Sequence, residues 1–161
     1  SSAIGEDSIN SSAAGMYDSV VATVDTFENA VSKVISSYPT KNPEHPILVQ
    51  PFLHNATLFG VVFSHVIDTH APYYVVSHGT THDGVTGGNE SSQSTFYHYH
   101  GCSTFHFKWE SLLYALIKKC QHFFNYMYLD IEFCVLPGNE IKLLQIRPLT
   151  TLRLKNEKKL N

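Results

Sequence analysis

Two short segments near the end of the chain carry side chains whose types and spacing suit phosphate and metal chemistry. Asp130 and Glu132 are separated by one residue, and so are Gln145 and Arg147 further along. Residues 137–140 between the segments read Pro-Gly-Asn-Glu, in which Gly-Asn suits the two-residue turn of a β-hairpin. Side chains two residues apart in a strand point to the same face. The pattern therefore predicts that all four polar side chains gather on one face of a hairpin.

A Gly-Asn turn fixes the pairing of the two strands. The predicted partners are Leu136 with Ile141, Cys134 with Leu143, Glu132 with Gln145, and Asp130 with Arg147. The opposite face of the hairpin would then carry the apolar residues Leu129, Ile131, Phe133, Val135, Leu144 and Ile146. We expect that apolar face to pack against the core, since burying it is the strongest constraint on the register.

Two chemical interpretations of the polar face are open. Carboxylate and amide oxygens are hard ligands of the kind that Mg²⁺ binds, and a guanidinium matches two phosphate oxygens at once. Magnesium and arginine together stabilise the charge that spreads over a phosphoryl group during its transfer. Alternatively, Asp130 and Arg147 form an ordinary cross-strand salt bridge on a solvated face. Geometry alone favours the salt bridge, and a register slip of one residue would separate the four side chains.

Two helices are expected to support the hairpin. An Asp25-x-x-Glu28 capping pattern precedes apolar residues at helical spacing and predicts a helix up to about residue 37. A longer helix is expected at about 108–126. Its apolar face would comprise Trp109, Leu112, Leu113, Leu116, Ile117, Cys120, Phe123 and Phe124.

Three further strands are expected at residues 47–53, 59–65 and 72–78, which are rich in Val, Phe and Tyr and separated by polar turns. Residues 79–106 show no clear period and are expected to form a long loop. The chain is therefore expected to have an α+β fold, with a mostly antiparallel sheet from residues 47–78 and 129–147 packed against two main helices. Residues 1–150 would form this domain, and the Lys-rich residues 151–161 a tail or linker.

Composition excludes several classes of protein. A net charge of -3 gives no electrostatic basis for binding nucleic acid or an anionic membrane. No apolar run reaches the roughly 20 residues that a membrane helix needs. The 3 cysteines are widely spaced and odd in number, which favours a reducing, cytoplasmic location over a disulfide framework.

The 10 histidines offer another possible site. His98 and His100 would share one face of an extended segment, with His106 nearby, and imidazoles bind transition metals. The alternative is a His-rich surface loop without metal. The alternative is favoured, because no cysteine or carboxylate completes a ligand set.

Several segments occur in an order that matches one known family. They are residues 1–8 (Ser-Ser-Ala-Ile-Gly-Glu-Asp-Ser), 14–19 (Ala-Gly-Met-Tyr-Asp-Ser), 49–53 (Val-Gln-Pro-Phe-Leu), 60–64 (Gly-Val-Val-Phe-Ser), 130–133 (Asp-Ile-Glu-Phe) and 143–150 (Leu-Leu-Gln-Ile-Arg-Pro-Leu-Thr). In this order they resemble the C-terminal portion of the ATP-grasp nucleotide-binding domain of phosphoenolpyruvate synthases and pyruvate phosphate dikinases. The resemblance spans nearly the whole chain, and its motifs are specific together although each is weak alone.

The resemblance implies a role for each matched residue. Glu132 and Gln145 would bind Mg²⁺ and the ATP phosphates, the catalytic Arg147 would hold the terminal phosphates, and Asp130 would support them. The cofactor-binding set would be completed by Gln50, Phe52 and Leu53 around adenine. With these matches the functional interpretation of the hairpin outweighs the salt bridge.

The resemblance also implies what lies outside the chain. The family's N-terminal ATP-grasp half and its phosphohistidine domain are absent here. In the family, ATP phosphate passes through that histidine to a small-molecule acceptor such as pyruvate or glutamine. We therefore expect a phosphotransferase component that does not turn over ATP by itself. The other hypothesis is a truncated, non-catalytic remnant that binds nucleotide weakly or acts as an interaction module.

Overall fold

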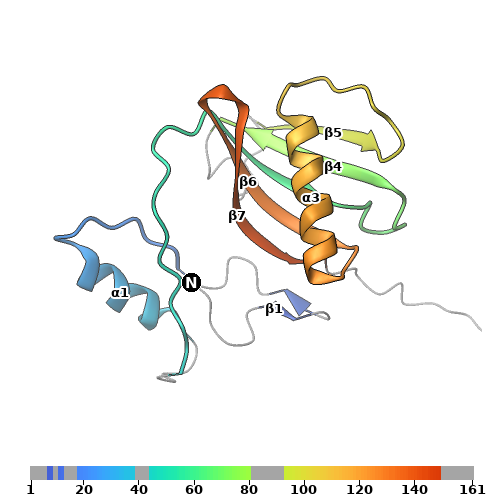
Figure 1. Cartoon of the computed structure of the whole chain (residues 1–161). Helices are drawn as coiled ribbons and strands as arrows, with labels where there is room; N and C mark the ends of the chain where they lie inside the picture. Colours follow the sequence, from blue (N-terminus) through green and yellow to red (C-terminus); the bar gives the residue numbers. More distant parts are fainter. Residues whose placement is uncertain (1–6, 9–10, 13–17, 39–43, 81–92, 150–161) are drawn as a thin grey trace, which may run out of the picture. The chain divides into compact units, whose positions relative to one another are not determined.

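The computed structural model describes residues 7–8, 11–12, 18–38, 44–80 and 93–149. It divides into two compact units, Ser1–His54 and Asn55–Asn161. The chain is α+β, as expected, with a five-stranded antiparallel sheet in the second unit (Figure 1). In the described part of the chain, no helix combines the length and apolar character needed to cross a membrane.

Among its described residues, the first unit contains one helix and a small strand pair. Strands β1 (Asp7–Ser8) and β2 (Ser11–Ser12) pair antiparallel, and helix α1 covers Phe27–Ser36. The expected cap at Asp25 is wrong. Thr26 occupies the N-cap position, and it makes no side-chain capping hydrogen bond. Its hydroxyl instead accepts a hydrogen bond from the Thr23 N–H at 2.9 Å, which closes the turn ahead of the helix.

Burial in the first unit is slight. Val34 and Tyr38 form a small buried cluster, with Val20 and Ile47 packed against it. The strand expected at residues 47–53 is not formed, and these residues have no regular secondary structure. Pro46 and Pro51 flank or interrupt the segment, and each removes an N–H that a sheet ladder would need. The apolar composition of the segment was therefore a misleading signal.

The sheet of the second unit has the strand order β5-β4-β3-β6-β7, and every neighbouring pair is antiparallel. Its strands are β3 (Leu58–Phe63), β4 (Tyr73–Gly79), β5 (Ser94–Tyr99), β6 (Leu129–Leu136) and β7 (Glu140–Pro148). The strands expected at 59–65 and 72–78 correspond to β3 and β4, displaced by one or two residues. The hairpin strand β6 lies next to β3, so the sheet joins elements far apart in the sequence.

Strand β5 was missed in the sequence. Its residues Ser94–Tyr99 fall inside the expected loop, yet they pair along β4 from Tyr73↔Tyr99 to His78↔Ser94. Phe96 and His98 point to the helix side of the sheet, where His98 is buried. A polar residue at an inward position hid the alternation of apolar and polar residues that would have indicated a strand.

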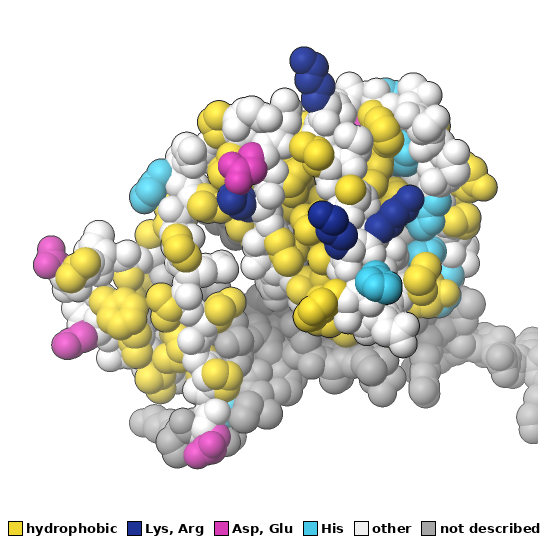
Figure 2. All heavy atoms as spheres, in the orientation of Figure 1, with side chains coloured by type: hydrophobic (Ala, Val, Ile, Leu, Met, Phe, Trp, Pro, Cys, Tyr) yellow, Lys and Arg dark blue, Asp and Glu magenta, His cyan; other side chains and the backbone are white. Residues whose placement is uncertain are grey.

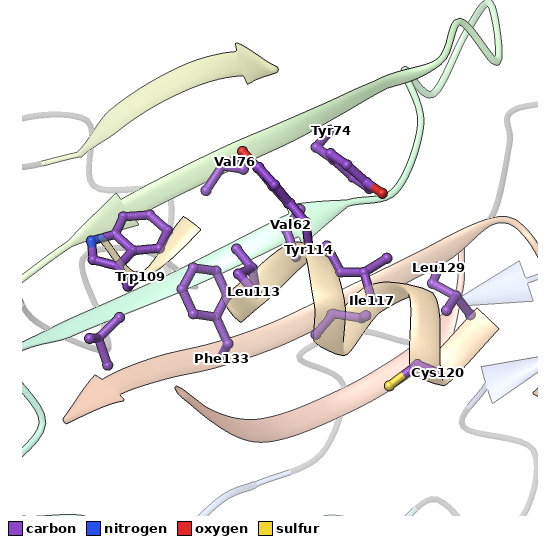
Figure 3. Close-up of a cluster of buried hydrophobic side chains, with 12 residues drawn as sticks. Val62, Tyr74, Val76, Trp109, Leu113, Tyr114, Ile117, Cys120, Leu129 and Phe133 are labelled. Atoms are coloured by element: carbon purple, nitrogen blue, oxygen red, sulfur yellow. The ribbon is translucent and has the colours of Figure 1, made fainter. Parts of the chain in front are cut away.

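Helix α3 (Glu110–Phe124) lies across one face of the sheet and buries the main core (Figures 1 and 3). Its inward side chains Leu113, Ile117 and Cys120 pack with Ile131 and Phe133 of β6. The buried cluster also contains Val62, Tyr74, Val76, Trp109, Tyr114, Leu129 and Val135. Asn125 caps the C-terminus of the helix, and its φ of 48° lies in the left-handed region that asparagine tolerates.

The apolar face expected for this helix is only partly correct. Leu112, Phe123 and Phe124 are exposed, with Phe123 at 81%. Figure 2, which views the helix side of the sheet, shows hydrophobic side chains between basic ones. The inward face instead includes Glu110 and Tyr114, which are buried. Both were outside the expected face because they are polar.

The hairpin differs from the expected one near its turn. Pro137–Asn139 form a three-residue turn, in which Gly138 and Asn139 both have positive φ. Leu136 therefore pairs with Glu140, and not with Ile141. Phe133 likewise pairs with Leu143, the residue that was expected opposite Cys134. A β-bulge at Leu144 then adds one residue to β7 before Glu132 pairs with Gln145.

The extra residue of the bulge compensates for the shift in register that the three-residue turn causes. From Glu132 to the open end of the hairpin, the pairs are those expected from the sequence. Ile131 pairs with Ile146 on the helix side, and both contribute to the core. Leu144, expected in the core, is the extra residue of the bulge and lies half-buried outside the core cluster.

Candidate functional site

The hairpin brings the four polar residues together as expected. Asp130 lies opposite Arg147 and Glu132 lies opposite Gln145, in neighbouring positions on β6 and β7. Residues directly opposite in an antiparallel pair have Cβ atoms about 4.5–5.5 Å apart, and side chains two residues apart share a face. Because Ile131 and Phe133 face helix α3, the four polar side chains lie on the other face of the sheet.

Asp130 and Arg147 form an ion pair. The Arg147 Nε donates a hydrogen bond to Asp130 Oδ2 at 2.7 Å. The Arg147 and Asp130 side chains are only 15% and 10% exposed. The salt bridge considered from the sequence therefore exists, but on a largely buried surface and not on a solvated one. A buried guanidinium held through Nε has a fixed direction, since Nε lies at the base of the planar group.

Glu132 and Gln145 form the second pair, and both are half-buried. Together they present carboxylate and amide oxygens from opposing strands, which is a donor set of the type that Mg²⁺ accepts. The ligand chemistry expected from the sequence therefore fits the residues present. Their roles as metal ligands remain a prediction.

The surface beside the four polar residues is apolar. On β3, Phe63 lies opposite Asp130 and Val61 lies opposite Glu132. The next strand continues the same rows with Val75 opposite Phe63 and Ser77 opposite Val61. The polar patch is therefore bordered by a strip of half-buried Val and Phe side chains, which would exclude water from one side of a bound charge.

The residues expected around adenine lie in the other unit. Gln50 and Phe52 are exposed and Leu53 is half-buried, in the segment that forms no strand. The Phe52 ring packs edge-on against His54, with ring centroids 4.8 Å apart. Their assignment to an adenine pocket stays a prediction.

The histidines that were considered as possible metal ligands make other contacts. His98 is buried, and its Nε2 lies 3.1 Å from the carbonyl of Cys102. The His100 Nε2 lies 2.9 Å from the carbonyl of Ser64. The His106 ring lies 6.4 Å from the ring of Phe96, between centroids. Across the described ranges, no group of three or more His, Cys, Asp or Glu side chains is arranged to hold a metal ion.

A buried carboxylate was missed in the sequence. Glu110 is fully buried, and its Oε1 accepts hydrogen bonds from the N–H groups of His106 and Phe107 at 3.1 and 2.9 Å. Its Oε2 lies 3.5 Å from the Tyr114 hydroxyl and 3.8 Å from His98 Nδ1. Burial and the Glu110 carboxylate raise the pKa of Tyr114 far above its usual value of 10.0.

Glu110 thus stabilises the turn before α3 through the N–H groups of His106 and Phe107. Its contact with His98 links β5 to the start of the helix. Acidic residues in the first turn of a helix are common, so the sequence contained a weak signal for this role.

Comparison with known proteins adds no assignment. No protein-family model matches the chain, and neither a curated protein nor a solved structure matches it.

Proposed function

We propose that the chain is the ATP·Mg²⁺-binding portion of a phosphotransferase that resembles phosphoenolpyruvate synthase. The observation that carries this proposal is the pairing of Asp130 with Arg147 next to Glu132 with Gln145, on one face of the sheet. Acids, an amide and a guanidinium in neighbouring cross-strand pairs match the charge pattern of a metal-bound polyphosphate. The resemblance in the order of motifs supports the same conclusion.

Each residue has a defined role in the proposal. Glu132 and Gln145 would hold Mg²⁺, which neutralises charge on the phosphate oxygens when it is bound. Arg147 would bind the terminal phosphates and is the proposed catalytic residue. Asp130 would orient Arg147 through the Nε hydrogen bond and would not itself touch the transferred group.

The acceptor lies outside this chain in the proposal. By the resemblance, a phosphohistidine domain would carry the phosphoryl group to a small molecule such as pyruvate or glutamine. A cytoplasmic location fits the state of the thiols, because Cys102, Cys120 and Cys134 are all free.

Calorimetry with ATP and Mg²⁺ tests the proposal. It would compare this chain with a longer protein in which an upstream ATP-grasp half is restored. The longer protein should bind, and Arg147→Ala and Glu132→Ala should each weaken binding by about tenfold or more, which corresponds to one lost charged contact. Lys142→Ala is the matched control, because Lys142 lies on the same strand but pairs with the exposed Glu140. Unchanged affinity in both site variants would contradict the proposal.

The second candidate is a non-catalytic remnant with weak nucleotide binding or a role in interactions. The buried Asp130–Arg147 ion pair favours it, since a closed pair can persist for structural reasons alone. The two candidates differ in turnover. The restored protein should phosphorylate its histidine domain from ATP under the first proposal, whereas the remnant would bind nucleotide without transfer.

A further inference from the structure

Aromatic and imidazole rings cluster at the end of the sheet where β3 stops and β6 begins. The His65 ring lies 4.8 Å from the rings of both His100 and Tyr128, measured between centroids. The His70 ring lies 4.6 Å from that of Tyr128. His65 is buried and His100 is half-buried. The proposed nucleotide site does not use any of these rings.

Ser64 connects this cluster to the first residue of β6. Its hydroxyl accepts a hydrogen bond from the Leu129 N–H at 2.8 Å and donates one to the Met127 carbonyl at 2.9 Å. The Ser64 N–H in turn donates to the Leu129 carbonyl at 2.8 Å. Ser64 is 1% exposed, so these bonds are shielded from water. They fix the position of Leu129, which directly precedes Asp130.

Both histidines give an N–H to Ser64. A hydroxyl has one hydrogen, and that of Ser64 goes to Met127, so the His65 Nδ1 must be the donor in its 3.2 Å contact with the Ser64 Oγ. The His100 Nε2 donates to the Ser64 carbonyl at 2.9 Å. A neutral imidazole has only one N–H. A second proton would therefore enter on the His65 Nε2 and the His100 Nδ1, away from Ser64.

The surroundings of His65 and His100 disfavour the doubly protonated, charged form of each ring. Burial lowers the pKa of His65, and the charges of His100 and His70 lower it further. Burial is also the main cause of the lowered pKa of His100. The bond to the Ser64 carbonyl acts in the other direction, and Lys118 and His98 add to the lowering.

The other groups around the cluster provide little negative charge to stabilise protonated His65 and His100. Tyr128 faces His65, and Tyr74 faces His100 with ring centroids 4.1 Å apart. Within the described residues, neither His65 nor His100 forms an ion pair with a carboxylate, and Glu110 reaches only as far as His98. Protonation of both rings would thus place two like charges side by side without a neutralising partner.

We propose that His65 and His100 form a pH-sensitive clamp on the start of β6. When both rings are neutral, they hold Ser64 against Leu129. When both rings are protonated, the two positive charges repel each other and favour contact with water. Ser64 then moves away from Leu129, and the start of β6, which carries Asp130, is released. The clamp is independent of nucleotide binding, because it rests on contacts within the chain alone.

Amide hydrogen exchange on the full chain tests the clamp without nucleotide. The protection factor of the Leu129 N–H should fall by about tenfold or more between about pH 7.5 and about pH 5, the range in which histidines titrate. Amides in the sheet centre, such as that of Val62, should change much less. An equal fall at Val62 would indicate global unfolding and would overturn the proposal, as would unchanged protection at Leu129.

Variants separate these histidines from the rest. His65→Gln with His100→Gln keeps a donor at each position without a titrating group, so the fall in protection at Leu129 beyond that at Val62 should disappear. His122→Gln is the matched control, since His122 is exposed on α3, and it should retain the fall. A fall at Leu129 that still exceeds the fall at Val62 in the double variant would refute the clamp.

NMR titration of the imidazoles in the unaltered chain gives a readout that needs no variant. Both His65 and His100 should titrate below the ordinary value of 6.5, and a midpoint at or above that value for both would refute the clamp. The affinity for ATP·Mg²⁺ at the two pH values is a separate measurement. Its outcome bears on the nucleotide proposal and leaves the clamp unaffected.

Discussion

Gly60 on β3 lies directly opposite Phe133 on β6, and the Phe133 ring covers the place where a side chain at Gly60 would be. A Cβ added at Gly60 would meet the ring carbons closer than real Cβ atoms approach a neighbour. Phe133 is fully buried and also contacts Trp109, with ring centroids 5.7 Å apart. Because Gly60 has no side chain, the ring of Phe133, the largest core residue of β6, packs against β3 next to the polar hairpin pairs.

Gly60→Ala should destabilise the second unit. The added methyl group forces the Phe133 ring to move within a packed core, and such overpacking costs about 1–3 kcal/mol. Urea unfolding of the purified chain, followed by Trp109 fluorescence, measures the change in the free energy of unfolding. Phe133→Leu shortens the opposing side chain, so Gly60→Ala should cost clearly less in that background. Equal costs in the two backgrounds would contradict the proposed contact.

Asp130→Ala should be among the most damaging single substitutions in the hairpin. It leaves the Arg147 guanidinium largely buried without its ion-pair partner, and loss of one partner of a buried pair costs about 3–5 kcal/mol. Lys142→Ala, which breaks the exposed pair with Glu140, should cost less than about 1 kcal/mol in the same unfolding experiment.

Replacing both partners, as in Asp130→Val with Arg147→Val, should recover much of the stability lost in Asp130→Ala. Apolar residues often substitute for a buried ion pair at little cost. If the double variant is stable but no longer binds nucleotide in the restored protein, the pair is retained for its ligand. A double variant as unstable as Asp130→Ala would show that the strands need these charges to pair.

Glu110→Ala should loosen the turn before α3. The substitution leaves the partly buried backbone N–H groups of His106 and Phe107 without their acceptor, and the loss of one such hydrogen bond costs about 1 kcal/mol. Thermal unfolding would show the loss as a lower Tm. Ser111→Ala alters the next position on the exposed side and should leave Tm nearly unchanged. Similar losses in the two variants would argue against the buried role of Glu110.

His78 should make the second unit less stable in acid. Its ring lies among the rings of Phe96, Phe107 and Trp109, at centroid distances of 5.9, 5.5 and 5.7 Å. Burial lowers the pKa of His78 below its usual 6.5, against an opposing effect of Glu110. The neutral form is therefore favoured in the fold. Its stabilisation is complete above pH 6.5 and is lost as the pH falls through the lowered pKa.

His78→Phe removes this titrating group and suits its aromatic surroundings. The free energy of unfolding should then decrease less steeply between about pH 6.5 and about pH 5 than in the unaltered chain. His122→Phe, at an exposed position on α3, should leave the slope unchanged. A slope for His78→Phe as steep as that of the parent chain would show that His78 does not contribute.

The site residues could be predicted because alternation alone decides their face. Asp130, Glu132, Gln145 and Arg147 occupy alternate positions beside apolar residues that must be buried, so their face follows from the core. Their pairing matches the expected one because the bulge at Leu144 compensates for the longer turn. The pairs near the turn could not be predicted in the same way. Whether a Pro-Gly-Asn turn contains two or three residues depends on local backbone angles, and both Gly138 and Asn139 adopt positive φ.

Other elements were hidden by residues that contradict their environment. Strand β5 places His98 in the core and was missed, whereas α3 was expected at about residues 108–126 and only its buried Glu110 was not. The prediction for residues 47–53 failed in the opposite way, since these largely apolar residues form no strand. Hydrogen bonds to nearby backbone groups let His98 and Glu110 be buried, and proline removes N–H groups from the segment 47–53, and periodicity reveals neither effect.

The bulge at Leu144 gives the hairpin a place where its length can change. Leu144 is the extra residue of β7 that is not paired with a residue of β6. A one-codon deletion at Leu144 would therefore leave Gln145 opposite Glu132 and Leu143 opposite Phe133. The same deletion at Leu143 or Gln145 would instead remove a paired residue. Natural insertions and deletions in this strand should therefore concentrate at a single position, with the acids and the guanidinium keeping their partners on either side of it.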